Sequence, residues 1–263
     1  MTPSHAYRIG VDENGLGARL GPLVVTAVLS RVSEQGNRLL SRRPPPRLRV
    51  DLDDSKELVS YGNVALGEAW ARALVGSVAR TPSDLITRLS LEGVAHLTAP
   101  CPSHVAPQCW SVEAEGFGAD ADALERISGH LGWWAARGVE ILAVKSSVVC
   151  TKRLNQERTG GGNRFVSDLH AMERLVIGLR EQVDADVLAV CGKVGGIDDY
   201  SKFFGPLSLR GLHSQLEQGR ALSAYHFPKV GEVRFVRDAD AKDCLVMLAS
   251  IVGKYVRELL MAR

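Results

Sequence analysis

Two pairs of carboxylates give this sequence its most informative chemistry. Asp12 and Glu13 lie side by side directly before a glycine-rich turn at residues 14–17, and Asp238 and Asp240 precede the last apolar stretch. A hard cation such as Mg²⁺ prefers oxygen ligands and keeps several waters, which suits it to phosphate chemistry. If the fold brings the two pairs together, we expect a carboxylate cluster able to hold such a cation.

Each pair also has a purely structural interpretation. Successive residues of a strand point to opposite faces, so Asp12 and Glu13 would be two surface acids unless the strand ends or twists there. The glycine turn that follows permits such a change of direction. Asp238 or Asp240 would cap the last helix and complement its dipole. The sequence leaves these alternatives open.

The carboxylates depend on strands and helices that hydrophobic periodicity predicts. Alternation of strands with helices favours an α/β or α+β fold with a mixed sheet, which we expect to form a single domain over residues 1–263. The predicted strands span 7–12, 23–32, 47–52, 139–149, 186–191, 220–227 and 232–237, and the predicted helices span 61–79, 120–137, 164–182 and from Asp240 to the end.

Composition restricts the classes of protein further. The 263 residues are 45% hydrophobic and 24% charged with a net charge of +2, which excludes a disordered tail, a collagen-like fibre and a disulfide scaffold. This charge neither requires nor forbids nucleic acid. The absence of a long apolar run and of a secretion signal, with five scattered cysteines, predicts a cytoplasmic protein with reduced thiols and no membrane partner. Cys101, His104 and Cys109 would form either part of a metal site or a loop with idle thiols.

Several motifs, in order along the chain, resemble the ribonuclease HII family. The order and spacing agree across most of the chain, except at residues 80–118, which look like an insertion. The matching segments are GVDENGLG at 10–17 (family GVDEAGRG), GPLVV at 21–25 (GPVV), DSKEL at 54–58 (DSKKL), LN at 154–155, ADVLAVCG at 185–192 (a strand ending in VDG), DAK at 240–242 and ASIVGKYVRE at 249–258 (ASI(I/L)AKVTRD).

The resemblance implies an RNase H-like fold, a mixed β-sheet flanked by helices. It also implies cleavage of RNA in RNA–DNA hybrids, or at single ribonucleotides in DNA, with two divalent metals (Mg²⁺ or Mn²⁺). We expect the protein to be a monomer whose partner is such a nucleic acid. Three catalytic, metal-binding carboxylates match: Asp12, Glu13 and Asp240. The implied substrate-binding residues are Gly15, Leu16, Gly17, Ser55, Lys56 and Lys242.

The basic residues near these motifs have structural alternatives. Lys56 and Lys242 would contact backbone phosphates, which add affinity without reading sequence, or would be solvated surface lysines. Lys254 and Arg257 lie about one helical turn apart. Rather than contact phosphates, they would each form a structural ion pair with an acidic side chain. The sequence does not decide between these roles.

The chain departs from the family pattern in three places. Cys191 stands where the family has the aspartate of VDG, a degenerate ligand position because a thiol is a poor magnesium ligand. Asp186 lies about 16 Å along the same strand at ~3.3 Å per residue, and Asp198 and Asp199 would have to fold back. Leu16 replaces the arginine of the GRG turn, with Arg19 nearby as a substitute. The sequence ends at Arg263 without the tyrosine-bearing segment that stacks at the RNA–DNA junction in the family.

Three functional hypotheses follow. The first is an active metal-dependent nuclease, and the second is a catalytically impaired relative that binds nucleic acid without cleaving it. The second rests on the loss of a metal ligand, since transition-state charge stabilisation is worth several kcal/mol. The third is an interaction module in which Trp110 and Phe117, within the insertion, form an interface. Local packing of these aromatic residues is the alternative.

Overall fold

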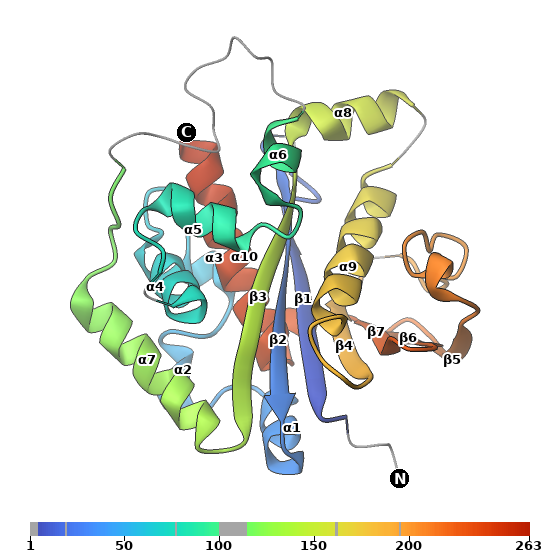
Figure 1. The fold of residues 1–263 in the computed structure, drawn as a ribbon, viewed down its shortest axis with the longest axis horizontal. Coiled ribbons are helices and arrows are strands. Elements are labelled where there is room, and N and C mark those ends of the chain that lie inside the picture. The colour runs from blue at the N-terminus through green and yellow to red at the C-terminus, as the bar shows by residue number, and fades with distance from the viewer. Residues whose placement is uncertain (1–4, 19, 77, 100–114, 161–162, 195) are drawn as a thin grey trace.

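The chain is built on one seven-stranded mixed sheet (Figure 1). The computed structural model describes residues 5–18, 20–76, 78–99, 115–160, 163–194 and 196–263. The strand order is β3-β2-β1-β4-β7-β6-β5, with β1 parallel to β4, β4 parallel to β7, and the other neighbours antiparallel. The strands are β1 (Tyr7–Asn14), β2 (Leu23–Val32), β3 (Val139–Val149), β4 (Val187–Gly192), β5 (Ser214–Gln218), β6 (Leu222–Phe227) and β7 (Gly231–Val236).

Helices cover both faces of this sheet, which confirms the expected α/β architecture of a mixed sheet flanked by helices. α4, α5, α7 and α10 pack on one face, and α9 packs on the other (Figure 1). The helices are α1 (Glu34–Leu40), α2 (Pro46–Arg49), α3 (Ser55–Leu58), α4 (Ala65–Val75), α5 (Pro82–Leu89), α6 (Gly93–Thr98), α7 (Ala121–Ala135), α8 (Thr151–Thr159), α9 (Arg164–Arg180) and α10 (Cys244–Ala262), with 3₁₀ turns η1 (Ser208–Arg210) and η2 (Ala239–Ala241).

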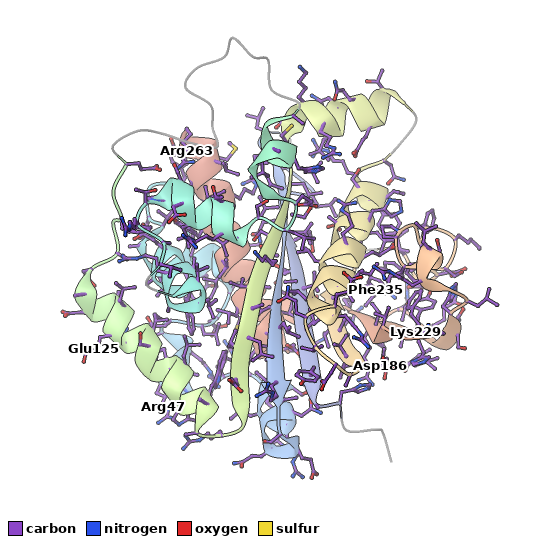
Figure 2. The ribbon with its side chains drawn as sticks, viewed as in Figure 1. Arg47, Glu125, Asp186, Lys229, Phe235 and Arg263 are labelled. Atoms are coloured by element: carbon purple, nitrogen blue, oxygen red, sulfur yellow. The ribbon has the colours of Figure 1, made fainter. Side chains whose placement is uncertain are left out.

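The side chains of β2 are buried on both faces of the sheet. Val24 and Val28 join the apolar cluster around α10, whereas Val25 and Ala27 join the cluster around α9. This explains why the strand reads as a continuous apolar run rather than as alternating residues. Phe235 of β7, labelled in Figure 2, belongs to the cluster on the α9 side.

The contact between β1 and α10 is unusually close. A Cβ atom at Gly10 would lie 2.4 Å from the carbonyl carbon of Leu245, so only glycine fits at this point of the strand. Asp243 caps α10 by accepting hydrogen bonds from the amides of Leu245 and Val246, and it pairs with buried Arg8 of β1. The cap and the ion pair together fix the start of α10 against the sheet.

The structure corrects several of the predicted elements. The strand predicted at 47–52 is wrong, because Pro46 occupies the first turn of α2, where a proline is well tolerated. The last helix begins at Cys244 rather than near Asp240, and residues 154–155 lie within α8, which precedes α9. The elements that were not predicted are short, exposed or weakly patterned: β5, α1, α3, α5, α6 and α8.

The described parts of segment 80–118 are integrated into the fold. Leu85 and Leu89 of α5 are fully buried in the core, and Ser90 forms a β-bridge with Ser146 of β3. Phe117 packs against the same core and beneath the Arg72 guanidinium, as local packing predicts. Trp110 and the trio Cys101, His104 and Cys109 lie outside the described residues. Within the described ranges, no helix is long and apolar enough to span a membrane.

Candidate active site

A pocket of about 300 Å³ opens where β1 ends and the glycine turn begins. Its walls come from β1 and the turn, from α3, from η2 and from α10, so four separate segments of sequence meet there. The residues that line the pocket are Asp12, Glu13, Asn14, Gly15, Leu16, Gly17, Ala18, Ser55, Lys56, Asp240, Ser250, Lys254 and Arg257.

Asp12 and Glu13 converge on one point although they are neighbours in a strand. A Cβ atom at Gly192 of β4 would lie 3.1 Å from Oδ1 of Asp12 and 3.3 Å from Oε2 of Glu13. Asp12 is only 8% exposed, so the surface-acid interpretation is wrong for it. The end of the strand and the twist of the turn allow both carboxylates to serve one site.

Burial and mutual repulsion shift the titration of both carboxyl groups. Burial, followed by the charge of Glu13, raises the pKa of Asp12 well above its ordinary value, while a hydrogen bond from Ser250 opposes the shift. Burial also raises the pKa of Glu13 to about 7, with Asp240 adding to the rise and Lys56 opposing it. Acidic groups in such surroundings are strongly stabilised by a bound cation.

Asp240 lines the pocket and does not cap the last helix. It lies within η2, one turn before α10, and the capping residue is Asp243. Asp238 has a left-handed backbone conformation (φ 55°), and its carboxylate lies 3.7 Å from Nζ of Lys242. The helix-cap interpretation is therefore wrong for both Asp238 and Asp240.

Hydroxyl groups brace the acidic side of the pocket. Ser250 of α10 is hydrogen-bonded to Asp12, and its Oγ lies 2.9 Å from Oγ of Ser55 at the start of α3. The side chain of Asp54 caps α3 by accepting a hydrogen bond from the amide of Lys56. This cap sets the position of Lys56, whose ammonium acts electrostatically on Glu13.

Two basic residues of α10 combine the roles that the sequence left open. Nζ of Lys254 lies 2.6 Å and Nη1 of Arg257 lies 3.2 Å from Oε1 of Glu258, so both form ion pairs. Both also line the pocket. Lys242, in contrast, is not among the lining residues and donates to the carbonyl of Arg237, so the pocket gives no support to its predicted role in substrate binding.

The glycine turn is held by arginines from two helices. Gly15 has a φ of 102°, and a Cβ atom there would lie 2.6 Å from Nε of Arg257. Nη1 of Arg164, the first residue of α9, donates to the carbonyl oxygens of Leu16 and Ala18. Guanidinium groups therefore reach the turn from both α9 and α10, whereas Arg19 lies outside the described residues.

Cys191 lies beside the cluster but does not line the pocket. Its side chain is fully buried in the apolar cluster on the α9 side of the sheet, and burial followed by the charge of Asp168 raises its pKa. The nearby acids do not replace it, because they are engaged elsewhere. Asp186 pairs with Arg180, Asp198 with Lys193 and Asp199 with Lys202.

Sequence reasoning missed Asp168 of α9. This carboxyl is fully buried, and neither of its oxygens has a hydrogen-bond partner. The available signal was an aspartate on the apolar face of a helix, next to Phe165, Leu169 and Met172.

The donor atoms of the pocket fit a hard divalent cation in chemical type. Asp12, Glu13 and Asp240 offer carboxylate oxygens, and the unpaired oxygens of Asp168 lie near them, whereas the Cys191 thiol suits softer metals. Among the described residues, no three acidic, histidine or cysteine side chains form a ready-made metal cage.

Comparisons with known proteins give a distant structural likeness. No family model matches the chain, and no curated protein matches it. A crystal structure of a glutamine-to-alanine mutant of Bst-RNase HIII is similar, with a TM-score of 0.41 and 14% sequence identity. The match covers 97% of this chain and 52% of that one, so the chain spans about half the length of that structure. The function has to be argued from the site itself.

Proposed function

We propose that this protein is a divalent-metal-dependent nuclease that hydrolyses phosphodiester bonds in RNA–DNA hybrids or at ribonucleotides within DNA. One observation carries the proposal: Asp12, Glu13 and Asp240 line a single pocket together with the cationic side chains Lys56 and Lys254. Clustered carboxylates suit a divalent metal, and flanking cations suit a phosphate backbone.

The residues of the pocket divide between holding the metal and holding the substrate. Asp12, Glu13 and Asp240 would bind Mg²⁺ or Mn²⁺, which polarises a phosphoryl oxygen and lowers the pKa of a bound water. Ser250 orients Asp12 through its hydrogen bond, so that the carboxylate keeps one direction when the ion enters. Lys56 approaches from α3 and offers its ammonium to a neighbouring phosphate.

Selection of RNA would fall to the glycine turn. The 2′-hydroxyl is the group that distinguishes RNA from DNA, and backbone groups are able to bind it. The positive φ of Gly15 brings backbone to the pocket wall without a side chain in the way. Arg164 donates hydrogen bonds to carbonyl oxygens of the turn and in this way orients the peptide groups of the turn.

A cleavage assay tests the proposal. Duplex DNA with one ribonucleotide and a continuous RNA–DNA hybrid are incubated with Mg²⁺ or Mn²⁺, and Asp12→Asn and Asp240→Asn are compared with the wild type. We expect both variants to lose at least 100-fold in rate, because lost charge stabilisation of ~3 kcal/mol corresponds to that factor. Asp238→Asn is the matched control, since Asp238 is exposed and two residues away, and it should cleave normally. Unchanged cleavage by Asp12→Asn would refute the assignment.

The second candidate function is binding of nucleic acid without cleavage, favoured by the buried thiol at Cys191. In that case the wild type would bind a hybrid in a gel-shift assay but would not cut it. Cleavage that Cys191→Asp restores would identify a scaffold that lacks one ligand. Hybrid cleavage by the wild type at ordinary enzyme rates would exclude this candidate.

A further inference from the structure

Asp168 is the most anomalous polar group in the described structure. It lies on α9, is 0% exposed, and has two carboxyl oxygens without a hydrogen-bond partner. Buried charges in proteins are normally paired or coordinate metals, because the loss of hydration is otherwise too costly. Glu173, on the same helix, is a buried carboxylate that does have partners, because it accepts hydrogen bonds from the amides of Gly205 and Leu207.

The start of α9 lies against the glycine turn of the acidic pocket, and the helix packs on β1 and β4. Arg164 opens the helix and binds the carbonyl oxygens of the glycine turn that forms the pocket wall. Asp168 follows four residues later and therefore lies on the same face of the helix, one turn deeper. The side chain consequently approaches the cluster from the face of the sheet opposite α10.

The electrostatic neighbours of Asp168 are the pocket carboxylates. Burial raises its pKa well above the ordinary value, and the charges of Glu13 and then Asp12 raise it further. Among the groups that act on it in the described structure, none is a cation. After burial, the charge of Asp168 is also the largest cause that raises the pKa of Cys191.

We propose that Asp168 is a further metal-binding carboxylate of this site, supplied by α9 where β4 offers only the thiol of Cys191. This inference rests on the proposed function, because it assigns one more ligand to the same cation. The structure supports it by the two buried, unpaired oxygens and by the packing of α9 against β1 and β4, the strands that carry Glu13 and Cys191. A cation shared with Glu13 would supply the partner that Asp168 lacks.

Titration with Mn²⁺, followed by calorimetry and by the electron paramagnetic resonance signal of the free ion, tests the assignment without nucleic acid. We expect Asp168→Asn to weaken Mn²⁺ binding at least tenfold, because one anionic ligand is lost while the shape is kept. Glu173→Gln is the matched control on the same helix and should bind Mn²⁺ like the wild type. In Asp168→Asn/Cys191→Asp, a carboxylate returns on β4, and we expect much of the affinity to return with it.

Each outcome decides the assignment. Wild-type affinity in Asp168→Asn overturns the role of Asp168 but leaves the proposed nuclease intact. Absence of Mn²⁺ binding by the wild type overturns both. Circular dichroism in EDTA verifies folding, and if Asp168→Asn does not fold, Asp168→Ser is titrated in its place with the same expected loss.

Discussion

The raised pKa of Glu13 predicts that the metal-free protein loses stability as the pH rises, and that Glu13→Gln removes this loss. Burial is the main cause of the shift from 4.5 to about 7, and the charge of Asp240 adds to it. The folded protein therefore holds the Glu13 proton more tightly than the unfolded chain. Stability from this group is present below pH 4.5 and is lost progressively as the pH rises through 7.

The size of the effect follows from the two pKa values. One pKa unit corresponds to about 1.4 kcal/mol, so the change from 4.5 to about 7 is worth about 3 kcal/mol once Glu13 is fully ionised. Glu13→Gln cannot ionise, so at pH 8 in EDTA it should be more stable than the wild type by about this amount. At pH 5 the gain should be no more than about 1 kcal/mol.

Urea denaturation followed by tryptophan fluorescence measures the difference, since Trp70 and Trp134 are fully buried and report global unfolding. Glu173, whose pKa is also raised to about 7, contributes equally to both proteins and cancels in the comparison. Added Mn²⁺ should stabilise the wild type at pH 8 and stabilise Glu13→Gln less, because a ligand of the ion is missing. An equal stability difference between the two proteins at pH 5 and pH 8 would refute the reasoning.

Three further predictions concern the elements that hold the site. Asp243→Ala should lower the free energy of unfolding by about 4–6 kcal/mol. The lost N-cap accounts for ~1 kcal/mol and the unpaired buried charge of Arg8 for ~3–5 kcal/mol. A loss of less than about 2 kcal/mol in a urea titration would contradict this. Gly10→Ala should destabilise by ~1–3 kcal/mol and weaken Mn²⁺ binding, because its Cβ would press on the backbone of Leu245; unchanged melting would show that β1 and α10 separate freely. Arg164→Ala should raise KM for a hybrid about tenfold, for ~1.4 kcal/mol of lost positioning, with a smaller effect on kcat; a loss confined to kcat would point to a different role.

Patterns within short stretches of sequence predicted most of the fold. The strands at β1, β2, β3, β4, β6 and β7 follow from apolar, β-branched runs, and α7 and α9 follow from helical periodicity. Prediction failed where local signals compete. Residues 47–52 contain apolar side chains at alternating positions, but the adjacent prolines favour a turn of helix.

Of the residues at the candidate site, some were identified from the sequence and others were placed only by the fold. Asp12, Glu13 and Asp240 were identified from their residue types and motif context, and the fold brings all three to one pocket. The role of Lys254 and Arg257 was left undecided, because basic side chains on a helix form ion pairs with acidic neighbours whether or not a pocket lies beside them. Only the packing of α10 against β1 places both residues at the pocket.

The sequence by itself therefore determined the strand that carries the acidic pair, the glycine turn after it, and a mixed sheet between helices. These depend on neighbours within a few residues, which a one-dimensional pattern records. The tertiary structure alone decided that Asp243 caps α10, that Arg164 reaches the glycine turn, and that Asp168 is buried without a hydrogen-bond partner. Such relations depend on which face of a helix meets which strand, and packing of the whole core sets that choice.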